Sequence, residues 1–367
     1  MSLHFDNSES VLSSVQNYYG KVLQKTEDLR TSACTLAQRP THPLYLRALS
    51  NVPPEVSAKF YGCGNPVPLG ISGLHVLDLG SGSGRDCYLA AQFVGENGFV
   101  TGVDMTQEQL DVATKCIPEF TRKMGYAKAN VRFVKGYIEF LKDAGIAPSS
   151  LDLVISNCVV NLSPNKKLVL QEVYNALKTG GEFHFSDVYC DRRLSDAVRS
   201  HEVLYGECVS GALYTNDFLR MAKEVGFGDP RQVSKSEINI YDPELKEILG
   251  EARFYSITYR LFKLPALEPA CEDYGQYATY KGSIHGMTHS YILDDHHKLE
   301  TNKPHLVCGN TASMLSETWL APHFTVVGDR KTHFGPFPCG PADAATSSAS
   351  SSSSCAPGVS CSSGSCC

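Results

Sequence analysis

The chain has 367 residues, enough for two or three domains, and its hydrophobic content of 42% supports packed cores rather than general disorder. A net charge of −6 argues against nucleic acid as a partner, and no apolar run reaches the roughly 18 residues of a membrane span. The first thirty residues contain no apolar signal segment, so we expect a cytosolic protein. In a reducing cytosol, the 14 cysteines need an explanation other than a disulfide framework.

Residues 1–70 are expected to form a segment of helices and loops ahead of the main fold. A helical pattern runs from Val11 to Val22, and Tyr18-Tyr19-Gly20 either covers a ligand site or simply docks this helix. Cys34 and Cys63 both fall on expected loops, and the glycines on either side of Cys63 indicate a turn. Thiols on such loops are predicted to be accessible to a ligand.

The centre of the sequence is a βαβ unit that extends from His75 to Asp104. A short apolar strand containing Asp78 leads into a G-x-G-x-G loop formed by Gly80, Gly82 and Gly84. Glycines let the backbone turn tightly and approach a ligand closely. A helix and a second strand follow, and Asp104 comes after that strand, where an acid can bind the hydroxyls of a ribose. This order is typical of a nucleoside-binding fold.

The glycine spacing differs from the G-x-G-x-x-G loop that holds a dinucleotide pyrophosphate at a helix N-terminus. The negative charge of Asp78 would repel a diphosphate and suits a cation. S-adenosylmethionine (SAM) is such a ligand, because it carries a sulfonium and an amine but no phosphate. Residues 71–190 are therefore predicted to form a class I SAM methyltransferase: an α/β, Rossmann-like sheet with helices on both faces.

Strands and helices continue to alternate after this unit. We expect a second helix over residues 106–120, strands over 130–134, 151–157 and 182–188, and a helix over 165–177. Ligands of open α/β sheets bind outside the carboxyl ends of the strands. Asn157 and Cys158, at the end of the fourth strand, are therefore predicted to lie beside the reacting methyl group.

Three further regions follow the predicted sheet. Residues 191–265 are expected to form a smaller α+β region, whose strand over 256–262 could extend the sheet as an antiparallel edge. Residues 266–340 are rich in Tyr, His and Gly and are interpreted as a small C-terminal domain, in which His296-His297 either bind a metal or lie at the surface. Residues 341–367 are nearly all Ser, Ala, Gly and Cys and are expected to be disordered.

The cysteines divide into two kinds. Cys87 and Cys116 are expected inside helices, where a free cysteine commonly behaves as a small buried hydrophobe. Four others fall on loops: Cys34, Cys63, Cys158 and Cys208. In a fold whose ligands lie above the strand ends, these four can converge on one cleft.

Converging thiolates beside a methyl donor suit a thiophilic substrate, and trivalent arsenic is the chemical match. Thiolates displace its hydroxides, and the remaining lone pair can attack the sulfonium methyl in line. The protein then contributes alignment, which intramolecular reactions put at up to about 7–11 kcal/mol. A small-molecule C-methyltransferase is the alternative enzyme, although it has no use for paired loop cysteines. A thiol-rich metal-binding protein with a vestigial SAM fold is a third interpretation, against which the intact acids argue.

At this point the sequence resembles the arsenite methyltransferases of the animal and algal type, over roughly residues 10–263 and more loosely over 266–340. The motifs that carry the resemblance are Tyr18-Tyr19-Gly20, Tyr61-Gly62-Cys63-Gly64, Leu77-Asp78-Leu79-Gly80-Ser81-Gly82-Ser83-Gly84-Arg85-Asp86-Cys87, Ser156-Asn157-Cys158-Val159-Val160-Asn161-Leu162, Phe185-Ser186-Asp187-Val188-Tyr189 and Gly206-Glu207-Cys208. A cysteine-bearing tail is also typical of that family.

The resemblance implies a role for each loop cysteine. Cys158 and Cys208 would hold arsenic throughout, Cys63 would be a third ligand for the first step, and Cys34 would be its redox or relay partner. The implied SAM site consists of Tyr19, Gly20, Asp78, Gly80, Gly82, Asp104, Met105, Ile138, Glu139 and Asn157.

The resemblance further implies arsenite or its glutathione conjugate as substrate, and methyl- and dimethylarsenic species as products. Thioredoxin or glutathione would restore the thiols. The tail cysteines Cys355, Cys361, Cys366 and Cys367 either scavenge arsenic or belong to a dispensable end, and we favour the second interpretation. Nothing in the sequence demands more than a monomer.

Overall fold

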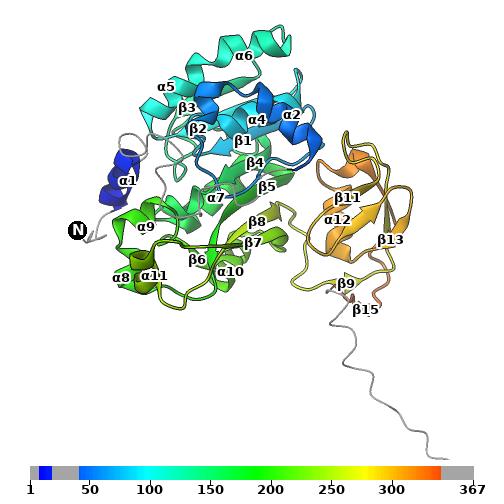
Figure 1. Ribbon diagram of the computed structural model, residues 1–367. Helices are drawn as coiled ribbons and strands as arrows, with labels where there is room; N and C mark the ends of the chain where they lie inside the picture. The colour runs from blue at the N-terminus through cyan, green and yellow to red at the C-terminus, as the bar shows by residue number, and fades with distance from the viewer. Residues whose placement is uncertain (1–7, 19–40, 340–367) are drawn as a thin grey trace, which may run out of the picture.

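The structure is a computed structural model of the chain, and it describes residues 8–18 and 41–339. An α/β body is followed by a smaller, mostly β region (Figure 1). The helices are α1 (Ser8–Asn17), α2 (Pro43–Asn51), α3 (Pro54–Ser57), α4 (Arg85–Val94), α5 (Gln107–Lys115), α6 (Ile117–Met124), α7 (Lys166–Ala176), α8 (Asp196–Arg199), α9 (Glu202–Gly206), α10 (Thr215–Val225), α11 (Pro243–Leu249) and α12 (Gly309–Ser316), with short 3-10 turns η3 (Val160–Leu162) and η4 (Ala321–His323). The strands are β1 (His75–Leu79), β2 (Phe99–Asp104), β3 (Val131–Lys135), β4 (Leu151–Asn157), β5 (Leu177–Cys190), β6 (Leu213–Tyr214), β7 (Arg231–Ile238), β8 (Phe254–Phe262), β9 (Glu272–Asp273), β10 (Tyr277–Tyr280), β11 (Ser290–Ile292), β12 (Lys298–Glu300), β13 (Pro304–Leu306), β14 (Phe324–Val327) and β15 (Gly335–Pro336).

In the described part of the chain, eight strands form the main sheet. Its order is β3-β2-β1-β4-β5-β8-β7, with the short β6 paired to β5. The first five of these strands run parallel, whereas β8 and β7 are antiparallel to their neighbours. The Rossmann-like sheet is therefore as predicted. The expected edge position of β8 is wrong, because β7 pairs with β8 and forms the edge itself. The polar, half-exposed side chains of β7 suit that position.

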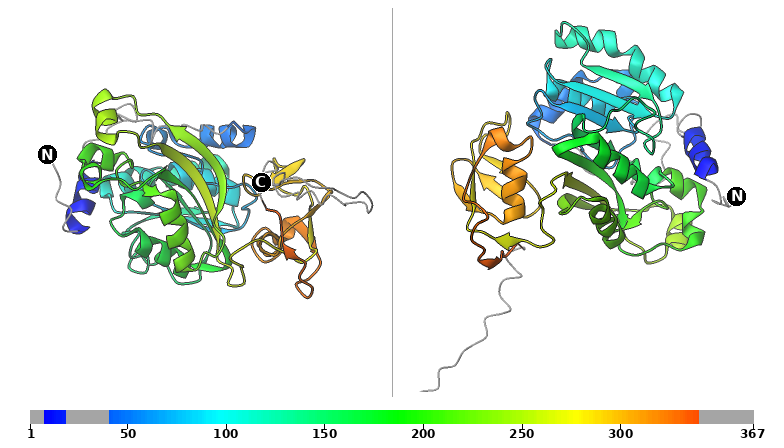
Figure 2. Two further views of the ribbon diagram at one scale, coloured as in Figure 1. Left: turned by 90° about the horizontal axis from the view of Figure 1, so that it is seen from below. Right: turned by 180° about the vertical axis from the view of Figure 1, so that it is seen from behind.

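Alternate residues of the central strands face two separate cores. Val76 and Ile155 pack with α4 on one face, whereas Leu77 and Val154 pack with α7 and α10 on the other. The turned views in Figure 2 show helices on both sides of the sheet. Because both faces are covered, the strands read as continuous apolar runs, which is why they could be recognised in the sequence.

The second expected helix is in fact two helices, α5 and α6. Pro118 lies in the first turn of α6, where a backbone N–H has no partner within the helix, so the missing N–H of proline costs nothing. Its ring cannot continue the preceding helix, which therefore ends. Cys116 lies between the two helices, so its predicted place inside a helix is wrong, although it is buried. Cys87 is fully buried within α4, as expected.

The region after β8 packs against a buried ion pair that lies within the sheet, between β8 and β5. Arg260 of β8 donates from Nε and Nη2 to the two carboxylate oxygens of Glu182 at 2.9 Å. The same guanidinium donates to the backbone oxygen of Leu293 at 2.9 Å, and the indole N–H of Trp319 donates to Glu182 at 2.8 Å. Both charged side chains are at most 2% exposed. No helix in the described ranges is long and apolar enough to cross a membrane.

Candidate active site

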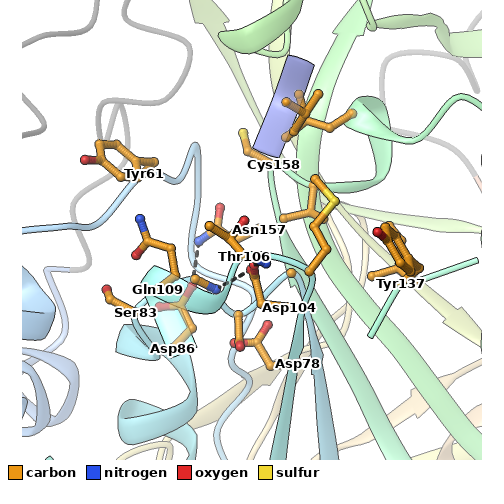
Figure 3. Close-up of a pocket in the computed structure, with 18 of the residues that line it drawn as sticks. Tyr61, Asp78, Ser83, Asp86, Asp104, Thr106, Gln109, Tyr137, Asn157 and Cys158 are labelled. Carbon is orange, nitrogen blue, oxygen red and sulfur yellow. Dashed lines mark hydrogen bonds between the residues drawn. The ribbon is translucent and has the colours of Figure 1, made fainter. Parts of the chain in front are cut away.

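A pocket opens at the carboxyl ends of β1, β2 and β4 (Figure 3). Most of the predicted SAM residues line it: Asp78, Gly80, Gly82, Asp104, Met105, Ile138, Glu139 and Asn157. Cys158 lines it too, and Figure 3 shows this cysteine at the opposite end of the pocket from Asp78. The remaining predicted residues Tyr19, Gly20 and Cys34 lie outside the described part of the chain.

Together with Glu139, three aspartates line this pocket, namely Asp78, Asp86 and Asp104. Burial raises the pKa of each, and the charges of the other two raise that of Asp78 further. The thiol of Cys87 donates to Asp78 at 3.2 Å, and Arg85 forms an ion pair with Asp86 at 3.0 Å. Such a crowded, buried set of acids favours a cationic ligand.

The glycine loop is shaped for close approach to that ligand. The backbone N–H of Gly82 donates to Asp104 at 2.8 Å, so the loop and the acid after β2 are held together. Gly80 has φ +60°, and a Cβ there would fall 2.3 Å from Cγ1 of Val159. The buried hydroxyl of Ser81 has no hydrogen-bond partner among the described residues, so it can bond a ligand. Sulfonium, amine and ribose hydroxyls of SAM fit these donors and acids.

Three of the four predicted cysteines come together at the end of β4. Cys63 and Cys158 are joined by a disulfide, with their Cα atoms 5.9 Å apart, and Sγ of Cys208 donates to the carbonyl oxygen of Cys158 at 3.0 Å. All three are at most 2% exposed. The predicted accessibility of Cys63 is therefore wrong. Its loop is held inward because Oδ1 of Asn157 accepts from the N–H groups of Cys63 and Gly64, at 3.0 and 3.2 Å.

Two of these cysteines have unusual backbone conformations. Cys158 has φ +58° and Cys208 has φ +63°. Residues with a Cβ rarely adopt the left-handed region, and such strain persists only where the surrounding structure imposes it, often at functional sites. Their two loops pack tightly, since a Cβ on Gly211 would fall 2.2 Å from the backbone oxygen of Asn161.

Asp187, at the end of β5, belongs to the same cluster. One of its carboxylate oxygens and the sulfurs of Cys158 and Cys208 all lie within 4.8 Å of one another. The carboxylate accepts from the backbone N–H and the side-chain amide of Asn161, at 3.1 and 2.8 Å. Burial raises the pKa of Asp187 to about 6. Asp187 lies in one of the motifs that carry the family resemblance, but no sequence pattern indicated a role for it.

Other pocket residues were also missed from the sequence. Asp86 gave no sequence signal, because an acid in the first turn of a helix is common and only the structure shows that this one is buried. Helix α1 supplies Leu12 and Val15 to the pocket wall, and Gln16 donates to the backbone oxygen of Met105 at 3.1 Å. Helix α1 therefore forms part of the pocket wall, whereas Tyr19 and Gly20, on which the two alternatives for Tyr18-Tyr19-Gly20 depend, lie outside the described residues. The further residues are Lys59, Phe60, Tyr61, Ser81, Ser83, Arg85, Thr106, Gln109, Gly136, Tyr137, Val159, Leu162 and Ser163.

The sheet, the glycine loop and the acids beside it define a class I SAM-dependent methyltransferase, and a family model described as a methyltransferase domain matches residues 71–226. The chain belongs to the arsenite methyltransferase family. It is 57% identical to the arsenite methyltransferase of Aquipseudomonas alcaligenes, over 88% of this chain and 93% of the relative. It is 43% identical to the arsenite methyltransferase of Homo sapiens, over 85% and 82% of the two chains.

A solved structure agrees with this membership. The crystal structure of CrArsM, an arsenic(III) S-adenosylmethionine methyltransferase from Chlamydomonas reinhardtii, is similar with a TM-score of 0.79 and 61% identity. The match covers 82% of this chain and all of that one. The small-molecule C-methyltransferase alternative is not favoured, because the relatives that match most of the chain are arsenite methyltransferases.

Proposed function

We propose that this chain transfers methyl groups from SAM to trivalent arsenic held by Cys158 and Cys208. Cys63 is the third ligand for the first transfer, and Cys34 is its redox partner. The observation that carries the proposal is the convergence of Cys63, Cys158 and Cys208 beside a pocket whose buried acids suit SAM. Arsenite as substrate is supported by the relatives, which are arsenite methyltransferases.

Arsenic binds by ligand exchange. Each thiol forms a sulfur–arsenic bond and displaces one hydroxide, which leaves as water with the thiol proton. The lone pair of arsenic then forms a bond to the methyl carbon that SAM supplies, and the electrons of the broken carbon–sulfur bond stay on the departing sulfur. Asn157 keeps donor and acceptor aligned, because its side chain bonds both Asp86 and the Cys63 loop.

Methyl transfer uses the arsenic lone pair and leaves arsenic pentavalent. Two thiolates can return it to the trivalent form by giving up two electrons and forming a disulfide. Cys63 and its proposed partner Cys34 supply these two thiolates, while Cys158 and Cys208 keep the arsenic. A reductant must then open the disulfide, and thioredoxin or glutathione is the proposed source of electrons. The bond between Cys63 and Cys158 must likewise be reduced before either residue can bind arsenic.

The remaining parts of the proposal follow from this chemistry. Residues 191–265 form the arsenic-binding region, because they supply Cys208, and residues 71–190 form the SAM domain. Arsenite or its glutathione conjugate enters, and methyl- and dimethylarsenic species leave. The protein acts as a monomer in the cytosol, where the reductants are found.

Product analysis tests the proposal. The purified full chain is incubated with arsenite, SAM, glutathione and a thioredoxin system, and the arsenic species are separated over time. Methylated arsenic that depends on SAM is the expected result, and the final species gives the number of methyl groups added. No methylated arsenic, with SAM binding intact by calorimetry, would overturn the proposal and direct the search to a carbon or oxygen acceptor.

A further inference from the structure

A second group of cysteines lies in the C-terminal region, outside the active site. The sulfurs of Cys271, Cys308 and Cys339 lie within 4.8 Å of one another. The three residues come from separate places in the sequence: one precedes β9, one is the N-cap of α12, and one follows β15 (Figure 1). Their convergence is thus a property of the fold and not of a local sequence motif.

Main-chain hydrogen bonds bring two of these cysteines together. Strands β9 and β15 are antiparallel neighbours, and the backbone N–H of Phe337 donates to the carbonyl oxygen of Cys271 at 2.8 Å. The N–H of Cys339 donates to the carbonyl oxygen of Phe337 at 2.8 Å. Cys271 and Cys339 are therefore held on one side of this small ladder, and both are partly exposed.

The third cysteine lies beneath them and is fully buried. Sγ of Cys308 accepts from the backbone N–H of Thr311 at 3.4 Å, as the cap of α12. The group therefore has one buried sulfur at a helix N-terminus and two partly exposed sulfurs close to it. Sulfur ligands in this arrangement suit soft metals and metalloids.

A small ligand can reach the group from a hollow at the surface. The hollow is lined by Cys271 and Cys339 together with Arg231, Tyr259, Asp294 and His297. It lies where β7 and β8 of the main sheet meet the C-terminal region. The two partly exposed cysteines, Cys271 and Cys339, line the hollow, and the buried Cys308 lies behind them.

We propose that Cys271, Cys308 and Cys339 form a second site for trivalent arsenic, separate from the catalytic cysteines. Three thiols exchange with the three hydroxides of arsenous acid: three sulfur–arsenic bonds form, three arsenic–oxygen bonds break, and three waters leave with the thiol protons. The exchange needs no oxidant or reductant. The inference rests on the proposed function only for the presence of arsenite as a ligand, and it assigns no step of methyl transfer to this site.

The number of ligands favours arsenic over zinc. A structural zinc ion takes four ligands in a tetrahedron. Among the described residues, this group contains three cysteines and no histidine or carboxylate. Trivalent arsenic is complete with three sulfurs, because its lone pair occupies the fourth position. His297 lines the same hollow, but its Nδ1 is bonded to Asp294 at 2.7 Å.

The charges around the group also favour a neutral complex. Arg231 extends toward Cys308, with Nη2 3.8 Å from the sulfur, but it already forms ion pairs with Asp229 at 2.7 Å and Asp294 at 3.0 Å. The positive charge of Arg231 is therefore already neutralised and does not balance the charge of a negatively charged complex. Three thiolates and one arsenic(III) carry no net charge, so the buried sulfur of Cys308 can take part without an unpaired charge.

Arsenic counting in the full chain tests the inference. Cys34, Cys63, Cys158, Cys208 and the four tail cysteines are changed to serine, which removes the other proposed arsenic ligands. The reduced protein is mixed with arsenite and gel-filtered, and arsenic and zinc are measured by mass spectrometry. We expect one arsenic per chain with three sulfur neighbours by X-ray absorption, and its loss after Cys308→Ser or Cys339→Ser. Cys116→Ser, a buried cysteine outside the group, should change nothing.

The variants are chosen so that folding can be separated from binding. Serine is itself a favoured N-cap, so Cys308→Ser keeps the cap of α12, and a melting curve checks each variant. Unchanged arsenic content in both Cys308→Ser and Cys339→Ser would overturn the inference, as would one zinc per chain that Cys308→Ser removes. The wild-type methylation assay tests the proposed function independently, so either can fail alone.

Discussion

The side-chain amide of Asn157 donates to the carboxylate of Asp86 at 2.8 Å, as can be followed in Figure 3. The same side chain accepts the backbone N–H of Cys63 at 3.0 Å. One residue at the end of β4 therefore connects an acid of the pocket to the loop that carries Cys63, the proposed third arsenic ligand. In the proposed reaction, this connection fixes the position of the acceptor cysteines relative to the methyl donor.

Replacing this residue should uncouple the two sites. Asn157→Ala removes hydrogen bonds to a buried carboxylate and to the Cys63 loop, and a bond to a charged group is worth about 1.5–3 kcal/mol. We expect the methylation rate to fall by roughly tenfold or more, measured as initial rates with arsenite. The control is Asn216→Ala. The exposed amide of Asn216 donates to the hydroxyl of Tyr214, its one partner in the described contacts. A wild-type rate for Asn157→Ala would contradict the role.

The cysteines should divide into two functional pairs. Cys158→Ser and Cys208→Ser remove the ligands proposed for every transfer, so both should abolish methylation of arsenite and of methylarsenic(III). Cys34→Ser and Cys63→Ser should abolish only the reaction of arsenite, because methylarsenic(III) needs one thiolate fewer. The products are separated by chromatography with each substrate in turn. Equal loss in all four variants on methylarsenic(III) would refute this division.

The parts of the site predicted from the sequence are those set by local pattern. The strand that carries Asp78, the glycines after it and the acid Asp104 follow one another in the chain, so their geometry follows from a single βαβ unit. The fourth strand, which ends at Asn157, was likewise predicted with its observed bounds, because its apolar residues are buried on both faces.

The parts that were missed depend on contacts between distant segments. Cys63 looked exposed because its neighbours are glycines, but Asn157, 94 residues away, draws the loop inward. Asp187 joins Cys158 and Cys208 only because β5 lies next to β4. The cluster of Cys271, Cys308 and Cys339 has no spacing that a pattern could reveal. Local periodicity contains no information about such pairings.

Stabilisation by SAM should depend on pH. Burial raises the pKa of Asp78, Asp86 and Asp104 above 3.8, so the folded protein binds more protons than the unfolded chain between that value and the raised pKa. The folded state therefore loses stability as pH rises through this window. A cationic ligand favours the ionised acids, so SAM should raise the melting temperature more at about pH 8 than at about pH 5.

S-adenosylhomocysteine is the matched control for this experiment, because it has the same shape without the methyl group and the sulfonium charge. Its effect on the melting temperature should change less with pH than that of SAM. An identical pH dependence for both ligands would mean that the acids do not respond to the sulfonium, and their role in selecting a cation would then be wrong.

Two glycines with similar backbone conformations should respond differently to alanine. Gly80 and Gly125 have φ of +60° and +73°, so a Cβ strains either by about 1–2 kcal/mol. A Cβ at Gly80 also falls 2.3 Å from Val159, whereas one at Gly125 meets nothing within 4 Å. Gly80→Ala should thus abolish SAM binding by calorimetry, and Gly125→Ala should keep it. Equal affinity in the two variants would contradict the close packing assigned to the glycine loop.

The buried ion pair between Arg260 and Glu182 should matter more than any surface pair. Arg260→Ala leaves Glu182 buried without its partner, which typically costs about 3–5 kcal/mol. Lys115→Ala removes an exposed pair with Glu55 that water screens, so it should change the stability little. Chemical denaturation measures both. If the two variants were equally stable, the buried pair would contribute no more to stability than a surface pair.

A double variant separates the attraction of this pair from the cost of an unpaired charge. Replacing both residues, as Arg260→Met with Glu182→Leu, removes the two charges together, and such replacements are often nearly neutral in buried sites. Arg260 also donates to the backbone oxygen of Leu293, and Trp319 donates to Glu182, so these groups lose their partners. We therefore expect the double variant to recover part, but not all, of the stability lost in Arg260→Ala. No recovery would mean that the bonds to Leu293 and Trp319, rather than the charges, hold the two regions together.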